Sequence, residues 1–590
     1  MPNGAELFVQ TIAGLGIDTI FTLVGDHLNE VLLAAAHSGI RIVDMRHESA
    51  VTHAADAWAR IHRKPALSLV TGGPGHTNSL TGIATANLAG SPLIAVSGSR
   101  ASTMAHRQAF QDIDQVEMAR PVVKWASEPP CAAEIPFYLR RAYTVANTGR
   151  KGAVHLTIPV DLFCSAGGLA ASPIAGGPVT GGKTAGAITA NAGAITVVAG
   201  ATTVTADAAT VVAGATTVLD MLRAAQRPVV IAGSGVWWSG AEDALRRFLD
   251  RTSFPLYTIT MARGAVSDEH PLAMGYADPA LNYAVHSAFR EADLFLVVGK
   301  RIDYRLAMGG SRLFPPEARF IQIDIHAEEF GLNRRLDAAI CADARAALDA
   351  LSDAVGPEPW APLPWLDRVR ELRRDWEARL ADIIRQDGPS ERAAAREVEA
   401  MHPAAFFREL RAALPRDVLY SWDGGDFAHW GRAMLPAREA GGWLRLGPLG
   451  TIGSSLPNGL ALQLAHPGRR VAVITGDGAL GFYIAEMDSA VRHKLPIVLI
   501  VGNDAGWGLE RELQSFANPG AATVACELQS ARYDLIMKGF GGQGESIERL
   551  DQVGPAVERA FASGVPYCLN VKIRGVRSPF TEWQIAGKRK

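Results

Sequence analysis

The feature that most constrains the fold is a recurring unit, in which a short apolar run ends in glycine or a polar residue and leads into a helix-like stretch. In the first 160 residues, the strand-like runs are DTIFTLV, ALSLVTGG and SPLIAVSG. Between them, the stretch ESAVTHAADAWARI places Val51, Ala54, Ala55, Trp58 and Ile61 on one helical face. The repetition of strand, helix and strand predicts an α/β fold of doubly wound parallel sheets, each covered on both sides.

The same unit returns in two further blocks, which are separated by segments of other composition. RPVVIAGSG and ADLFLVVG belong to the second block, and RRVAVITGDG and LPIVLIVGND belong to the third. The segment after the first block is almost wholly Ala, Gly, Thr, Val, Pro and Ile, and it contains VVAGATTV twice, at 197–204 and 211–218. Residues 184–206 carry no charge, but they are rich in Thr and Gly, so we expect a linker rather than a membrane span. The predicted parts are a first domain at 1–164, this linker at 165–226, a middle domain at 227–355, a helical linker at 356–400, a third domain at 401–575 and a tail at 576–590.

Charge and cysteine content exclude several classes of protein. Among 590 residues, 58 Lys and Arg balance 60 Asp and Glu, which argues against a general binder of nucleic acid or membrane surfaces. The five cysteines are scattered without a CxxC pair, so neither a disulfide framework nor a zinc ribbon is expected. The opening MPNGAELFVQ lacks a basic n-region, and we therefore expect a soluble cytoplasmic enzyme.

The strongest chemical motif follows two apolar strands of the third block. Gly476, Asp477 and Gly478 end one strand, and a second strand ends at Asn503. Neighbouring parallel strands would bring Asp477 and Asn503 to the same carboxyl edge of a sheet. Carboxylate, amide and main-chain oxygens suit Mg²⁺, and the two glycines let the backbone approach a diphosphate closely.

The GDG segment at 476–478, followed by Asn503 at the end of the next strand, resembles a known signature. It is the signature of thiamine diphosphate (ThDP) enzymes of the acetolactate synthase, benzaldehyde lyase and oxalyl-CoA decarboxylase group. The resemblance covers nearly the whole chain and implies a pyrimidine-binding domain, a middle domain and a diphosphate-binding domain. It implies Mg²⁺ ligands at Asp477, Asn503 and the carbonyl of Ala505, although the family often has a second Asn where this chain has Asp504. The remaining cofactor contacts that it implies are Gly424, Gly425, Asp426, Gly450, Ile452, Gly476, Gly478 and Ala479.

Two further segments support the same resemblance. MRHESAVTHAADAWAR resembles the segment with the family's cofactor-activating glutamate, which is Glu48 here. Its carboxyl group would relay a proton to the pyrimidine ring of the cofactor. LGPLGTIGSSLP resembles the segment that bends the cofactor, with Ile452 wedged between its two rings and the Gly450 carbonyl accepting a hydrogen bond from its amino group.

Substrate choice depends on other residues. His27 and Gln111, with the run DQVEMARPVVKWA, are similar to benzaldehyde lyase, and AFQDIDQ also resembles oxalyl-CoA decarboxylases and 2-hydroxyacyl-CoA lyases. His27 or a relay through Gln111 and Glu48 could take the proton of a substrate hydroxyl. Glu510 follows Trp507 and Gly508 and replaces an apolar residue of benzaldehyde lyase, so it either faces the substrate or lies on the helix surface. The tail VRSPFTEWQIAGKRK could cover the active site and contact phosphates of coenzyme A (CoA).

The sequence therefore predicts a ThDP- and Mg²⁺-dependent lyase most like 2-hydroxyacyl-CoA lyase, which forms an aldehyde or ketone and formyl-CoA. The alternatives are a CoA-independent acyloin lyase and an acetolactate-synthase-like transferase on pyruvate. A ThDP fold without catalysis is disfavoured, because Glu48 and the predicted metal ligands are all present. Related middle domains hold FAD or ADP, and MARGAVSDEHP with VGKRIDYRLAMGG resembles those sites. The resemblance also implies at least a homodimer, with a homotetramer as the usual form.

Overall fold

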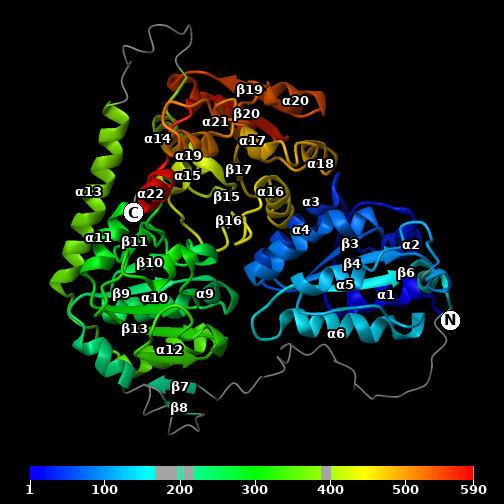
Figure 1. Ribbon diagram of the computed structural model, residues 1–590, viewed down its shortest axis with the longest axis horizontal. Coiled ribbons are helices and arrows are strands. Elements are labelled where there is room, and N and C mark those ends of the chain that lie inside the picture. Colours follow the sequence, from blue (N-terminus) through cyan, green and yellow to red (C-terminus); the bar gives the residue numbers. More distant parts are fainter. Residues whose placement is uncertain (106, 167–195, 200–201, 205–216, 387–399, 589–590) are drawn as a thin grey trace.

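The computed structural model has three α/β domains, each built on its own mainly parallel sheet (Figure 1). It describes residues 1–105, 107–166, 196–199, 202–204, 217–386 and 400–588. The predicted fold class is confirmed, because apolar runs such as Val471–Gly476 form central strands that helices cover on both faces.

The first domain holds a six-stranded parallel sheet in the order β2-β1-β3-β4-β6-β5. Its strands are β1 (Thr19–Thr22), β2 (Arg41–Asp44), β3 (Ala66–Val70), β4 (Leu93–Ser99), β5 (Ala126–Ser127) and β6 (Val154–Pro159). Its helices are α1 (Gly4–Gly14), α2 (Asn29–His37), α3 (Glu48–His62), α4 (Pro74–Ala89), α5 (Gln115–Ala119), α6 (Ile135–Asn147) and α7 (Val160–Cys164).

The middle sheet has the order β11-β10-β9-β12-β13-β14-β7-β8, and its first six strands are parallel. The first VVAGATTV copy forms the antiparallel pair β7 (Thr196–Ala199) and β8 (Thr202–Val204), which extends the sheet edge at β14. The expected linker therefore includes two strands of this sheet, while most of its other residues lie outside the described ranges. The remaining strands are β9 (Pro228–Ala232), β10 (Leu256–Thr258), β11 (Ala273–Tyr276), β12 (Leu294–Val298), β13 (Arg319–Asp324) and β14 (Ala338–Cys341). The helices are α9 (Ser234–Trp238), α10 (Glu242–Thr252), α11 (Tyr283–Glu291), α12 (Ala344–Val355) and α13 (Pro364–Gln386).

The third sheet has the order β16-β15-β17-β18-β20-β19, which is the strand order of the first sheet. Its strands are β15 (Leu419–Trp422), β16 (Trp443–Arg445), β17 (Val471–Gly476), β18 (Val498–Asn503), β19 (Gln543–Ile547) and β20 (Tyr567–Lys572). Its helices are α14 (Pro403–Ala413), α15 (Gly425–Met434), α16 (Ser455–Ala465), α17 (Asp477–Leu480), α18 (Glu486–Arg492), α19 (Gly508–Ala517), α20 (Tyr533–Gly539) and α21 (Val553–Ala562). The tail forms α22 (Pro579–Lys588), which contacts α15 and α19 (Figure 1).

Two helices connect the domains. Helix α13 contacts α11 of the middle domain and then reaches α14 of the third domain (Figure 1). Helix α3 of the first domain contacts α16 of the third. In the described part of the chain, no helix is both long enough and apolar enough to cross a bilayer.

Candidate functional site

A cavity of about 200 Å³ opens at the carboxyl ends of β15, β17 and β18 in the third domain. Most of the residues predicted to hold the cofactor line this cavity. They are Gly424, Gly425, Asp426, Ile452, Gly476, Asp477, Gly478 and Ala479. Gly450 does not line it, and the hydroxyl of the adjacent Thr451 instead bonds to Thr85 of the first domain at 2.9 Å.

Glycines keep the walls of this cavity thin. A Cβ on Gly424 would lie 3.0 Å from Cγ2 of Ile452, and a Cβ on Gly478 would lie 2.9 Å from the Trp507 ring. Gly425 has φ of +80°, a conformation that side chains disfavour. The backbone can therefore approach a ligand closely at these positions.

Helices α15 and α19 both begin at the cavity, and neither has a side-chain cap. Gly424 precedes α15 and Trp507 precedes α19, and neither makes a capping hydrogen bond. Their first N–H groups and the positive ends of their dipoles favour an anionic ligand such as a diphosphate.

Acidic side chains also line the cavity, and a Cβ on Gly508, the first residue of α19, would lie 2.5 Å from Oδ2 of Asp504. Burial and the neighbouring Asp477 carboxylate raise the pKa of Asp504, and both aspartates line the cavity. Oδ2 of Asp477 accepts a hydrogen bond from the Gly506 N–H at 3.1 Å. Because the residues on either side of Gly506 bond to the segment around Glu527, the Gly506 N–H and carbonyl point away from that segment. Two carboxylates and a main-chain carbonyl are hard oxygen donors, so these residues fit a Mg²⁺ ion that joins a diphosphate to the protein.

Two of the three expected metal ligands lie away from the cavity. Neither Asn503 nor Ala505 lines the cavity. The Asn503 amide donates to the carbonyl oxygen of Ala531 at 2.9 Å and to Oδ1 of Asn570 at 3.1 Å. The Ala505 carbonyl accepts from the Leu528 N–H. The structure therefore favours Asp504 and the Gly506 carbonyl over Asn503 and Ala505.

Two further aspartates organise the cavity. Asp423, which the sequence analysis missed, is fully buried and accepts hydrogen bonds from the Gly453 N–H and from the hydroxyls of Ser455 and Thr475. It fixes the end of β15 to the loop that carries Ile452, and the signal that could have found it is the acidic residue directly after the strand LYSW.

Asp426, predicted as a cofactor contact, also anchors the tail. Its Oδ1 accepts hydrogen bonds from the hydroxyls of Ser578 and Thr581, while its Oδ2 has no partner. Burial raises the pKa of Asp426 to about 6.

His27, Glu48 and Gln111 gather elsewhere, around the segment 71–78 that follows β3 in the first domain. Glu48 begins α3 and accepts a hydrogen bond from the Asn78 amide at 3.0 Å. A Cβ on Gly73 would lie 2.7 Å from Cβ of Gln111, so that side chain rests directly on this segment. None of the three lines the cavity in the third domain.

His27 is buried, and its hydrogen bonds indicate its tautomer. Nδ1 lies 2.8 Å from the Thr71 hydroxyl and accepts from the Gly72 N–H at 3.3 Å. Nδ1 is therefore the acceptor, and the proton belongs on Nε2. Burial lowers the pKa of His27, which favours the neutral ring.

Two residues missed by the sequence analysis hold this segment in place. Gln115 is buried, accepts from the Gly73 N–H at 2.9 Å and donates to the Gly98 carbonyl at 3.0 Å. Glu486 of the third domain accepts from the Arg46 N–H at 3.0 Å, two residues before Glu48. Gln115 lies in the AFQDIDQ segment quoted above, which could have marked it, whereas Glu486 had only its polarity in apolar surroundings.

Glu510 lines the cavity in the third domain but is exposed to solvent. It therefore lies at the mouth of the cavity, between the two alternatives that the sequence left open. The tail joins the same wall, because residues 573–576 line the cavity directly before α22.

A second cavity of about 300 Å³ lies at the carboxyl ends of β9, β12 and β13, between the middle and first domains. Basic residues that include Arg150, Lys151 and Arg301 line it, and Asp324 follows at the end of β13. A Cβ on Gly235 would lie 2.6 Å from Cα of Gly299, so the two loops touch through glycine alone. These residues fit a nucleotide, with cations for its phosphates and a carboxylate for its ribose.

Comparisons with known proteins agree with this layout. Three family models match: thiamine pyrophosphate enzyme, N-terminal TPP binding domain at residues 2–118, central domain at 215–351 and C-terminal TPP binding domain at 423–571. The chain is 32% identical to an acetolactate synthase large subunit from Mycobacterium tuberculosis, over 96% of this chain and 95% of that protein. It is 29% identical to 2-hydroxyacyl-CoA lyase 1 from Mus musculus, over 97% and 94%. It is also 29% identical to 2-hydroxyacyl-CoA lyase 2 from Caenorhabditis elegans, over 92% and 84%.

Proposed function

We propose that this chain, which belongs to the thiamine pyrophosphate enzyme family, is a carbon–carbon lyase that cleaves a 2-hydroxyacyl-CoA into an aldehyde or ketone and formyl-CoA. The observation that carries the proposal is the neutral His27 imidazole beside Glu48 and Gln111. Such a group suits a substrate with a hydroxyl or carbonyl oxygen that must be held while its proton moves.

The cofactor would bind with its diphosphate at the starts of α15 and α19. Asp477, Asp504 and the Gly506 carbonyl would hold the Mg²⁺ ion, and Ile452 would support the rings of the cofactor. When bound, ThDP supplies a nucleophilic carbon and an electron sink for the bond that breaks. The protein's own task is then to bind, orient and move protons.

Each proton-handling residue has a distinct role in this proposal. Glu48 would exchange a proton with the pyrimidine ring of the cofactor. The Nε2–H of His27 would donate to the substrate oxygen, which refines the expectation that His27 is a base. As the bond between the carbonyl carbon C1 and the hydroxyl-bearing carbon C2 breaks, the hydroxyl proton would pass to Glu48 through the relay that includes Gln111. A proton from the same relay would return to C1, which departs as formyl-CoA.

A second subunit completes the site in this proposal. Glu48 does not line the cavity of its own chain, so the first domain of one subunit would meet the third domain of another. The smallest active form would be a homodimer, and we expect a homotetramer. ADP or FAD would occupy the cavity between the middle and first domains.

The experiment is a mass-spectrometric cleavage assay with ThDP and Mg²⁺. It offers a small branched 2-hydroxyacyl-CoA and, in parallel, benzoin and pyruvate. Formation of formyl-CoA from the 2-hydroxyacyl-CoA, with no product from benzoin or pyruvate, would support the proposal. Acetolactate from pyruvate would support the second candidate, which the 32% identity to an acetolactate synthase favours. Benzoin cleavage without a CoA product would indicate a CoA-independent acyloin lyase.

A further inference from the structure

A cavity of about 390 Å³ lies apart from the cofactor site, where α13 crosses from the middle to the third domain. Helices α13, α14 and α15 and strand β11 line it, and it shares no lining residue with the cavity that holds Asp477. Its size is within the range of small-molecule sites.

The lining of this cavity is strongly cationic. Six arginines face two acids, Asp268 and Glu377. The arginines are Arg263, Arg373, Arg385, Arg408, Arg411 and Arg432.

Five of these arginines have partners. Arg263 pairs with Asp268, Arg373 with Glu377, Arg385 with Asp382 and Arg408 with Glu409, and Arg411 donates to the Met434 carbonyl. Arg432 differs from them. It is only 3% exposed, and its Nε and Nη1 have no hydrogen-bond partner among the residues that the structure describes.

The surroundings of Arg432 add positive charge rather than neutralise it. Burial, Arg445 and Arg305 outweigh the opposite effects of Tyr276 and Asp278 and lower the pKa of Arg432 to about 9, so it remains a cation at neutral pH. Asp278 already pairs with Arg305 at 2.8 Å. A buried cation without a partner is costly, and an anion in the cavity would compensate for it.

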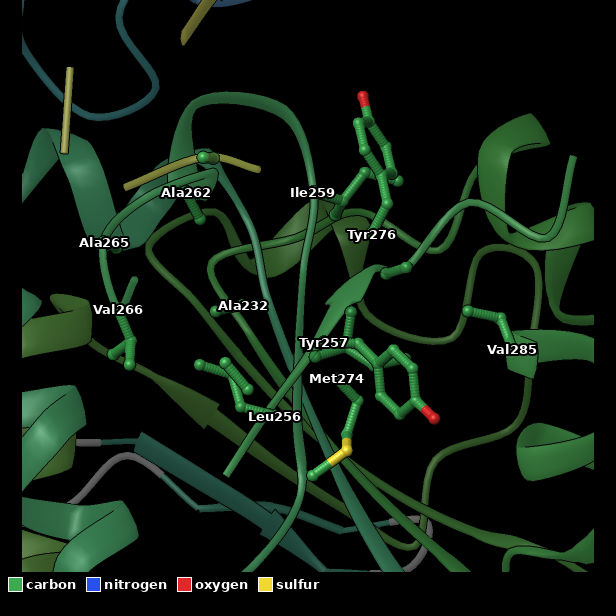
Figure 2. Close-up of a cluster of buried hydrophobic side chains, with 14 of the residues drawn as sticks. Ala232, Leu256, Tyr257, Ile259, Ala262, Ala265, Val266, Met274, Tyr276 and Val285 are labelled. Carbon is green, nitrogen blue, oxygen red and sulfur yellow. The ribbon is translucent and has the colours of Figure 1, made fainter. Parts of the chain in front are cut away.

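Tyr276 contributes a polar group to the same wall. In Figure 2 its ring stands apart from the apolar cluster of Leu256, Tyr257 and Met274, with the hydroxyl pointing away from that cluster. The hydroxyl accepts a hydrogen bond from Arg445 at 3.3 Å. The remaining wall is apolar and includes Met274, Leu281, Trp376, Leu380 and Leu435.

We propose that this cavity binds a small amphipathic anion, with a carboxylate or phosphate group on Arg432 and an apolar body along the apolar wall. The exposed Arg385, Arg408 and Arg411 at the mouth would attract the ligand. Helix α15 joins the two sites, because its first residues line the cofactor cavity and its last residues line this one.

The test is isothermal titration of the holoenzyme, loaded with ThDP and Mg²⁺, at fixed ionic strength. The probes are phenyl phosphate, benzoate and inorganic phosphate. We expect saturable binding of phenyl phosphate or benzoate, and weaker binding of inorganic phosphate because it lacks the apolar body. Tighter binding of phenyl phosphate would identify the head group of the ligand as a phosphate, and tighter binding of benzoate would identify it as a carboxylate.

The variant Arg432→Met should lower the affinity at least about tenfold. Arg549→Met, which removes an exposed arginine outside every cavity described above, is the matched control and should bind as the parent does. If Arg432→Met fails to fold, Ala433→Phe tests the site by filling it, since Ala433 is half-buried in the lining. Absence of saturable binding by the parent overturns the proposal. Equal binding by a folded Arg432→Met, or by Ala433→Phe where Arg432→Met does not fold, also overturns it.

Discussion

The first and third sheets have the same strand order, yet their carboxyl edges differ. In the first sheet, His27, Gln111 and Gln115 fill the space around the segment after β3. In the third, glycines follow β15 and β17, and a cavity remains. The comparison teaches that the side chains around these segments, rather than the strand order, decide which edge is filled and which edge keeps a cavity.

The largest expected effect tests whether Glu48 transfers protons without contributing to ThDP binding. Glu48→Gln should lower kcat by roughly 10²–10⁴, because the amide cannot exchange the proton, while ThDP affinity stays nearly unchanged. Steady-state kinetics and ThDP titration measure the two effects. Glu30→Gln, an exposed change in the same domain, is the control. Unchanged turnover of Glu48→Gln would contradict the assigned role.

The second prediction concerns ligand binding at the edge of the third sheet. Asp477→Asn removes a carboxylate from the predicted metal site and should weaken Mg²⁺ and ThDP binding by roughly 10–100-fold. Calorimetric titration of both ligands measures this, with the exposed Asp551→Asn as control. Binding equal to that of the parent would show that the metal lies elsewhere.

The neighbouring carboxyl groups of Asp477 and Asp504 predict that Mg²⁺ affinity depends on pH. The first sheet should not contribute to this dependence. In the cofactor-free protein, burial and Asp477 raise the pKa of Asp504 from 3.8 to about 7. Between pH 3.8 and about 7, the Asp504 carboxyl is protonated in the folded state and ionised in the unfolded state. The stability of the folded state therefore falls as pH rises through this range. Mg²⁺ needs the ionised form, so its affinity should rise with pH up to about 7.

Asp504→Asn should flatten this rise. Mg²⁺ titrations between pH 6.5 and 8, with ThDP present, provide the measurement, because Asp426 has a pKa of about 6 and titrates mostly below that window. The same slope in Asp504→Asn and the parent would assign the proton to another group.

The extent to which sequence predicts this molecule depends on the kind of interaction. Buried parallel strands must be apolar on both faces, so runs such as Val471–Gly476 were visible, and so was the glycine-flanked Asp477. The choice between Asn503 and Asp504 was not visible: Asn503 ends β18 and donates to Asn570, whereas Asp504 lines the cavity. A shift of one residue along a strand reverses the face, and composition does not record it.

Long-range contacts were beyond the reach of the sequence for a different reason. Arg432 gains its surroundings from helices and strands that lie far apart in the chain, and no local pattern marks them. The VVAGATTV repeat is similar, because its first copy contributes β7, which pairs with the distant strand β14. Local chemistry was predictable, and contacts between distant segments were not.

The smallest expected effect concerns the tail, whose helix α22 contacts α15 and α19 of the third domain. Ser578→Ala removes one hydroxyl from Asp426 and should weaken docking of α22 by about 1 kcal/mol. Because that hydroxyl lowers the pKa of Asp426, its loss should raise the pKa further above about 6. Limited proteolysis of the C-terminus should quicken a few-fold, whereas Thr581→Ser, which keeps its hydroxyl, should behave as the parent does. If Ser578→Ala and the parent were cleaved at the same rate, apolar contacts such as that of Phe580 with His429 would hold the tail, and Asp426 would be left to the cofactor.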